Sequence, residues 1–233
     1  MTLLTPSNST DGLLRRKAGP KPNALMPHDQ PDRYNFSFIG VSLRPELARI
    51  VAEHYLAAGD WEEAKKRILS SNALQSRTTA AAVRLERELR QRLRTLTDDQ
   101  LSWLAQATTD DGVAMTWLAA CKSSPFIFDF AVEVLREKIA THDTVLRYSD
   151  YESYIGGKVG MHPELGLLSD GSMVKVKQIL LRMLAEASML GAGAALGVLR
   201  RPVLSPTVVR LIVADNPRWL AAFLVPDVEI GRM

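Results

Sequence analysis

The chain has 233 residues, long enough to bury a sizeable core as one domain or two small ones. Its residues are 46% hydrophobic and 24% charged, a composition typical of globular proteins that excludes disorder over most of its length. The net charge is only +3, so nucleic-acid binding has to be argued from the distribution of charge and not from its sum.

Targeting and membrane signals are not predicted. Leu3 and Leu4 precede Pro6 and polar residues, so the apolar core of a signal peptide is missing. The most apolar later run, residues 183–199, contains Glu186 and several glycines and is too short to cross a bilayer. The single cysteine, Cys121, excludes an internal disulfide and is expected to be a buried hydrophobe on a helix. We therefore expect a cytoplasmic protein without membrane contact.

Residues 1–34 are predicted to form a flexible basic arm. Prolines and glycines interrupt them, and they lack a periodic apolar pattern. Arg15, Arg16, Lys17 and Lys21 make the segment basic. A solvated tail is the simpler interpretation, and contact with a phosphate backbone is the alternative.

From Phe36 onward, helical periodicity dominates the sequence. Pro45 is expected to begin a helix, because the N–H that proline lacks has no partner in a first turn. Asp60 is expected to cap the next one, with acidic residues in its first turn and basic residues toward its end. Later helices are predicted to start at Thr78, Thr97, Asp110 or Asp111, Pro125, Ser149, Asp170 or Ser172, and Pro206.

These patterns predict an all-α protein with two parts. Residues 35–145 should form a compact helical bundle and residues 146–233 a smaller C-terminal helical unit, with the boundary between Thr141 and Ser149. The only strand candidates are residues 197–199 and 202–204, which flank Arg200 and Arg201 and would form a short hairpin or wing.

The predicted helix from Thr78 to Leu96 has the clearest functional pattern. At 100° per residue, one stripe is apolar and comprises Ala82, Leu85, Leu89, Leu93 and Leu96. The opposite side is assigned Arg84, Arg87, Arg90 and Arg94, with Arg77 near the start of the helix. One sign of charge thus predominates, as expected of a surface that contacts a polyanion. The alternative is a solvated face whose arginines pair with acidic residues elsewhere.

A second basic face is predicted on the helix from Ser172 to Leu190. Lys175, Gln178 and Arg182 share the side away from its apolar stripe, and these residue types reach phosphates and base edges in a major groove. With Arg200 and Arg201 on a wing, the unit would be helix-turn-helix-like. Against this, the preceding helix ends near Lys158, which leaves a connection much longer than a simple helix-turn-helix has.

Signals of catalysis are weak throughout. The glycine-rich run 191–197 has the wrong spacing for a dinucleotide loop and follows a helix. His28, His54, His142 and His162 lack the spacing of metal ligands, and His54 lies on an apolar stripe. Residues 55–64 look like part of a tetratricopeptide repeat, but a second copy is missing. We expect no enzyme activity, cofactor, metal or small-molecule substrate.

Several segments in a fixed order resemble the BrxA family of BREX bacteriophage-exclusion systems. The segments are Phe36 to Gly40, Glu46 to Ala58, Gly59 to Glu63, Asn72 to Thr78, Trp117 to Lys122, Phe130 to Lys138, His162 to Glu164, and Leu204 to Pro206. The resemblance covers residues 35–215 and implies an accessory protein that binds double-stranded DNA, with other BREX subunits as further partners. A protein-binding scaffold within the BREX assembly is the alternative function, and RNA binding is a third that no aromatic stacking motif supports.

Overall fold

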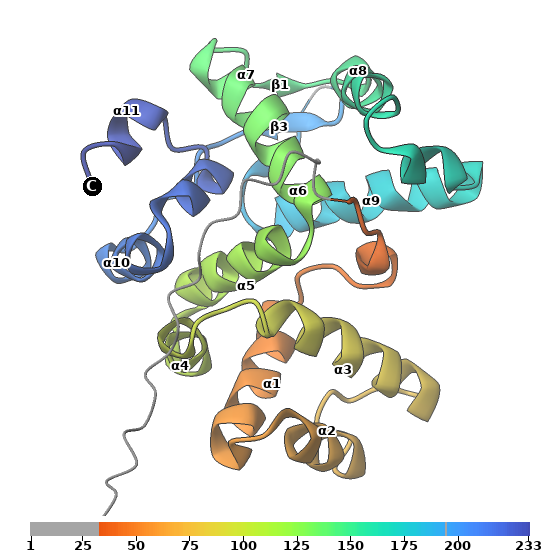
Figure 1. Ribbon diagram of the computed structural model, residues 1–233, viewed down its shortest axis with the longest axis vertical. Helices are drawn as coiled ribbons and strands as arrows, with labels where there is room; N and C mark the ends of the chain where they lie inside the picture. The colour runs from red at the N-terminus through yellow and green to blue at the C-terminus, as the bar shows by residue number, and fades with distance from the viewer. Residues whose placement is uncertain (1–32, 194) are drawn as a thin grey trace, which may run out of the picture. The chain divides into compact units, whose positions relative to one another are not determined.

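The computed structural model describes residues 33–193 and 195–233 of the chain. Most of these residues lie in helices, so the predicted all-α class is confirmed (Figure 1). The basic residues expected in the N-terminal arm, Arg15, Arg16, Lys17 and Lys21, lie outside the described residues. Tyr34, the last residue of the expected arm, is buried in the core.

The N-terminal part consists of five helices that follow a short 3-10 helix. Asp60 caps α2 by accepting hydrogen bonds from the N–H groups of Glu62 and Glu63, both at 2.9 Å, as predicted. Thr108, and not Asp110 or Asp111, caps α5, because the two acids lie in the first turn near the positive end of the helix. The elements are η1 (Ser37–Gly40), α1 (Pro45–Ala58), α2 (Trp61–Ser70), α3 (Thr79–Leu93), α4 (Asp98–Gln106) and α5 (Thr109–Ser123).

The C-terminal part contains the remaining helices and all of the strands found in the described residues. A long helix starts at Pro125, as predicted, and continues through a π-helical stretch to Ala140. Its parts are α6 (Pro125–Phe130), η2 (Ala131–Arg136) and α7 (Glu137–Ala140). The later helices are α8 (Tyr148–Lys158), η3 (Pro163–Leu167), α9 (Asp170–Glu186), α10 (Pro206–Asp215), η4 (Pro217–Phe223) and α11 (Asp227–Ile230).

A small antiparallel sheet with the order β1-β3-β2 joins parts of the chain that are distant in sequence. It consists of β1 (Val145–Leu146), β2 (Leu190–Gly191) and β3 (Gly197–Leu199). The register pairs Val145 with Val198 and Leu190 with Leu199. The predicted strand 197–199 is therefore confirmed, but the predicted partner 202–204 is wrong, and β2 takes its place. Pro202 cannot donate a backbone hydrogen bond, which disfavours pairing there.

Helix α5 runs through the middle of the described chain, with α1 and α3 on one side and α9 and α10 on others (Figure 1). Its residues from Met115 to Cys121 are all buried, and the expected burial of Cys121 is confirmed. The described residues form one compact unit. Strand β1 (Val145–Leu146) spans the boundary expected between residues 145 and 146, and it pairs with β3 of the C-terminal part. Every helix among the described residues is too short or too polar to cross a bilayer.

Candidate nucleic-acid interface

The elements from Pro125 to Leu199 have the topology of a winged helix. A helix (α6 to α7) is followed by β1, then by the helices α8 and α9, and finally by β2 and β3, with β3 between the other two strands. This is the order of a helix-turn-helix motif with an added wing, in which the helix in the position of α9 enters the major groove. The helix-turn-helix-like alternative considered from sequence thus matches the observed topology, with the wing between β2 and β3 and the unit starting at Pro125.

Helix α9 has one buried face and one polar, solvent-exposed face. Its buried residues are Val176, Leu180, Met183 and Leu184, all fully inaccessible to solvent. Lys175, Gln178 and Arg182 are exposed, as predicted. Lys175 and Arg182 make no ion pair within the described part of the chain. Both charges therefore face solvent on the helix that occupies the recognition position.

Lys177 has a different role from the other basic residues of α9. Its Nζ atom lies 3.4 Å from Glu152 Oε1 and 5.4 Å from the ring centres of Tyr148 and Tyr151, all on α8. These contacts hold α8 against α9. Lys177 therefore stabilises the packing of α8 on α9, in contrast to the exposed Lys175 and Arg182.

The long connection between α8 and α9 is a packed structure and not an open loop. His162 is buried, and its ring stacks on Tyr34 at a centroid distance of 3.6 Å. The Tyr34 hydroxyl donates to Asp129 at 2.8 Å and lies 3.1 Å from the Tyr154 hydroxyl, and burial is the main cause that raises the pKa of Tyr34. The connection length that argued against a helix-turn-helix is accounted for by η3 and this anchoring cluster.

The arginines of α3 do not form the single face that was predicted. Arg77, Arg84, Arg87 and Arg94 are exposed, and none makes an ion pair to another described residue. Arg90 was expected on this face, and that prediction is wrong. Its guanidinium is buried, with Nε 2.7 Å from Glu86 Oε1 and Nη1 3.4 Å from Glu62 Oε1. Arg90 lies about 100° from the centre of the apolar stripe, on a flank of α3 that α2 covers.

The exposed arginines of α3 point to two different neighbours. Arg84 lies against η1, because a Cβ atom built on Gly40 would be 3.5 Å from Arg84 Cζ. Arg94 lies on the other side of the helix, with Cζ 5.9 Å from the centre of the Trp61 ring of α2. Only the first side adjoins the segment after Gly40, which is hydrogen-bonded to Glu186 of α9. The structure therefore separates arginines that helical periodicity had placed on one face.

Arg200 and Arg201, predicted to lie on the wing, follow β3 and have different environments. Arg200 is exposed and lies beside Gly191 of β2. Arg201 makes a two-point salt bridge to Glu229, at 2.9 and 2.5 Å, which holds the pKa of the Glu229 carboxyl below its usual range. Because a carboxylate already neutralises Arg201, we retain only Arg200 in the candidate interface.

Sequence reasoning missed Arg44, which precedes Pro45 and α1. Its φ of 52° places it in the left-handed region, its side chain is exposed, and it makes no ion pair to another described residue. The sequence does not mark Arg44 as a candidate contact residue, because it belongs to neither of the two amphipathic helices with a basic face. The structure brings Arg44 close to α9, because the N–H of Leu43, directly before it, donates to Glu186 of α9.

Gly197 begins β3 and sets the geometry of the wing. Its φ is +142°, and a Cβ atom there would lie 2.5 Å from the Gly191 carbonyl oxygen and 2.9 Å from Leu190 Cδ1. Gly197→Ala should therefore lower the free energy of unfolding by about 1–3 kcal/mol, measured by urea unfolding. Gly160→Ala, at a glycine whose surroundings are open, is the control and should cost under about 1 kcal/mol. Equal losses in both variants would contradict the constraint at Gly197.

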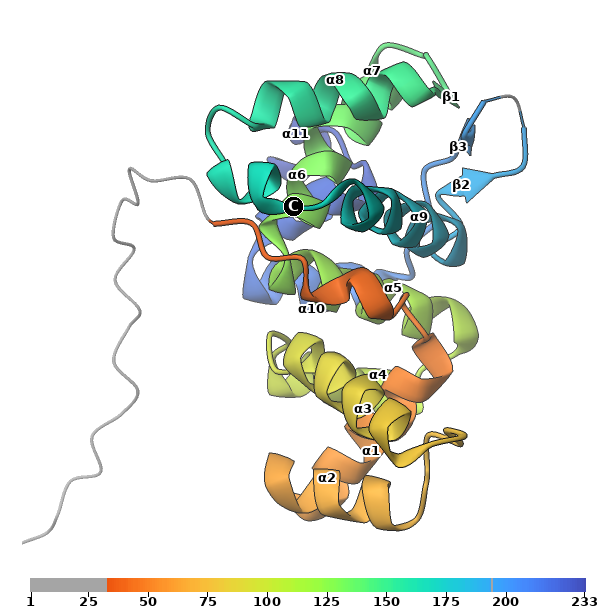
Figure 2. The same cartoon turned by 90° about the vertical axis from the view of Figure 1, so that its right-hand side faces the viewer.

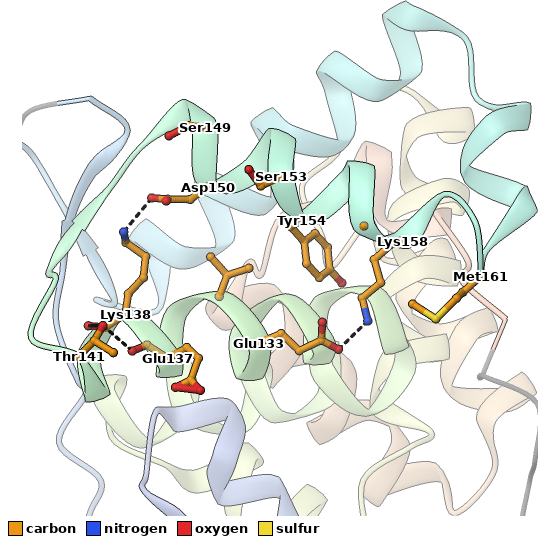
Figure 3. Close-up of a pocket in the computed structure, with 12 residues that line it drawn as sticks. Glu133, Glu137, Lys138, Thr141, Ser149, Asp150, Ser153, Tyr154, Lys158 and Met161 are labelled. Atoms are coloured by element: carbon orange, nitrogen blue, oxygen red, sulfur yellow. Dashed lines mark hydrogen bonds and ion pairs between the residues drawn. The ribbon is translucent and has the colours of Figure 1, made fainter.

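A groove away from this surface lies between α8 and the helix that runs from α6 to α7 (Figure 3). It has a volume of about 560 Å³. Its two lysines are engaged by carboxylates: Lys138 Nζ lies 2.9 Å from Asp150 Oδ2, and Lys158 Nζ lies 2.6 Å from Glu133 Oε1. With Glu137 also exposed on its wall, the groove is acidic and does not suit a phosphate backbone.

The sequence model of the BrxA family matches residues 32–216. The chain belongs to the BrxA family. Two relatives have the name BREX protein BrxA. The protein of Escherichia coli O9:H4 (strain HS) is 27% identical over 149 residues, 64% of this chain and 70% of that protein. The protein of Bacillus cereus (strain H3081.97) is 25% identical over 170 residues, 73% of this chain and 82% of the relative. The resemblance predicted from sequence is therefore confirmed.

A solved structure supports the fold of this BrxA family member. It is the crystal structure of an uncharacterized protein from Magnetospirillum magneticum, with a TM-score of 0.72 and 21% sequence identity. The similarity covers 82% of this chain and 98% of the other. The fold of this chain therefore recurs in an experimental structure.

Proposed function

We propose that this BrxA family member is a non-enzymatic component of a BREX phage-defence system that binds double-stranded DNA through its winged helix. The observation that carries the proposal is the exposed polar face of α9, with Lys175, Gln178 and Arg182 at the recognition position of the motif. The names of the two relatives support a place in a BREX system.

The side chains of α9 suit different contacts. Lys175 and Arg182 are exposed cations without an ion pair in the described chain, so phosphate binding does not require them to leave a carboxylate. Gln178 has an amide that can bind the N6 and N7 atoms of an adenine. Arg200 lies beside β2 and is placed to contact the backbone near the wing. Most of the affinity would then come from phosphates, with limited base readout.

Exchanging Lys175 and Arg182 for glutamine and Gln178 for alanine should weaken duplex binding about 10- to 100-fold near physiological salt. The slope of log K against log salt should fall by about 0.9 for each phosphate that is no longer bound, so by about 1.8 for two. Fluorescence anisotropy with duplex DNA, single-stranded DNA and RNA in parallel measures both quantities. Glutamine and alanine form helices well, and circular dichroism checks that α9 persists.

The matched control is Arg49→Gln with Arg67→Gln, which also removes two positive charges. These residues lie on α1 and α2 and already pair with Glu53 and Glu63. Control affinity close to that of the unchanged protein supports α9 as the contact surface, whereas equal losses would indicate a general effect of charge. An α9 variant with unchanged duplex affinity would overturn the proposal.

A scaffold role within the BREX assembly is the competing proposal, and the acidic groove of Figure 3 is the observation that favours it. If the protein is a scaffold, it should fail to bind duplex DNA even at low salt. It should also co-elute with another purified BREX subunit in size-exclusion chromatography. RNA binding would instead appear as tighter binding to RNA than to duplex DNA in the same titration.

A further inference from the structure

The segment from Gly40 to Arg44 connects the basic side of α3 to α9. On the α9 side, Glu186 accepts hydrogen bonds from the Ser42 hydroxyl and the Leu43 N–H, both at 2.7 Å. On the α3 side, the Arg92 guanidinium donates to the carbonyls of Val41 and Ser42 at 2.6 and 2.7 Å. Figure 2 shows η1 and the start of this segment between α9 and α3. These hydrogen bonds fix the position of α9 relative to α3.

Exposed cations flank this segment on both sides. Arg84 lies against Gly40 on the α3 side, and Arg44 directly follows Leu43, which is bonded to α9. On α9, Arg182 precedes Glu186 by one helical turn, so it shares the side of α9 that faces the segment. Lys175 is two turns before Arg182 on the same side. These four residues are exposed and make no ion pair to other described residues.

Carboxylates near these cations are already engaged. Glu88 is buried and accepts hydrogen bonds from Arg92, and both oxygens of Glu186 are used by Ser42 and Leu43. The opposite side of α3 differs, because Arg90 is bound there by Glu86 and Glu62, and α2 adds further acids. On the side of α3 toward η1, a polyanion therefore meets the least competition from protein carboxylates for the exposed arginines.

We propose that Arg44 and Arg84 form a second phosphate-binding site, so that one duplex runs from α9 across η1 to the edge of α3. The proposal rests on the proposed function, since α9 supplies the primary contact. It assigns to the N-terminal helices a direct part in DNA binding that a winged helix alone does not require.

The spacing of the elements sets the length of DNA that is needed. Packed helices lie about 8–10 Å apart, so α9 and α3 with η1 between them are separated by roughly 20 Å. At about 3.4 Å per base pair, this corresponds to about six base pairs beyond the contacts of α9. A duplex of about 10 base pairs should reach only α9, and one of about 24 base pairs should reach both sites.

The test compares two double variants of equal charge on both duplexes. Arg44→Gln with Arg84→Gln removes the proposed site. Arg67→Gln with Arg94→Gln is the control, because it removes two exposed arginines on the side of the molecule where α2 contacts the end of α3. Affinity is expressed per binding register, so that the larger number of registers on the long duplex is not counted as a gain. Circular dichroism and urea unfolding establish that both variants keep the fold.

We expect Arg44→Gln with Arg84→Gln to weaken binding of the long duplex about 10-fold and to lower its salt slope by about 1.8, with the short duplex unaffected. The control should match the unchanged protein on both duplexes. Equal losses for the two variants, losses of the same size on short and long duplexes, or an unchanged long-duplex affinity would each overturn the second site. If the unchanged protein binds neither duplex at low salt, the proposed function itself fails, which is a separate result.

Discussion

Replacing Arg92 by methionine should lower the free energy of unfolding by about 3–5 kcal/mol, because it removes one partner of a buried ion pair. Arg92 is 2% exposed and donates to Glu88 Oε1 through Nε at 3.2 Å and Nη2 at 3.1 Å. Burial lowers the pKa of Arg92, and the adjacent Glu88 carboxylate opposes that shift. Without the guanidinium, Glu88 and the carbonyls of Val41 and Ser42 lose their charged donor.

A double-mutant cycle in urea tests this explanation. Arg92→Met with Glu88→Met removes both buried charges, so it should recover part of the loss, although the two backbone carbonyls still lack a donor. Arg92→Lys should give an intermediate value, since a lysine keeps the charge but not the planar set of donors. A loss under about 1 kcal/mol for Arg92→Met would show that the pair is not a determinant of stability.

Trp117→Ala is the second change with a large expected effect. Trp117 is fully buried on α5, and its Nε1 donates to the Ala222 carbonyl at 2.9 Å, which ties η4 to the centre of the fold. Truncation of such a side chain costs about 3–5 kcal/mol. For a chain of this size the melting temperature should fall by about 10 °C, which differential scanning calorimetry measures.

Two other tryptophan variants separate packing from hydrogen bonding. Trp117→Phe keeps much of the ring volume but leaves the Ala222 carbonyl without its donor, so we expect a loss of about 1–3 kcal/mol. Trp219→Ala removes a partly exposed ring near the surface and should cost less than Trp117→Ala. Similar losses for Trp117→Ala and Trp219→Ala would be inconsistent with a central role of Trp117 in the core.

The segment from Gly40 to Arg44 affects both the stability of the fold and the proposed DNA contact. Arg92 and Glu186 hold this segment between α3 and α9, and the exposed Arg84 and Arg44 lie at its two ends, beside Gly40 and directly after Leu43. A variant that loosens it should therefore affect long duplexes more than short ones. The N-terminal helices would then contribute both to the fold and to the length of DNA that is bound.

Local sequence determined the helices and most of their starts. Pro45, Asp60, Thr97, Pro125 and Pro206 begin or cap helices where predicted, because the interactions involved span only a few residues. The outward face of α9 also followed from periodicity, since that helix is covered on one side only. The same patterns, with the ordered segments of the BrxA resemblance, were enough to predict the family.

Only the tertiary structure decided which charges are available. Arg90 and Arg92 are both charged residues of an amphipathic helix, yet both are buried, because α2 covers one flank of α3 and the Val41–Ser42 segment covers the other. Arg201 is neutralised by Glu229, 28 residues later in the chain. The wing depends on pairing of β2 with β3 and of β3 with a distant β1. Such contacts join residues far apart in sequence, and helical periodicity contains no information about them.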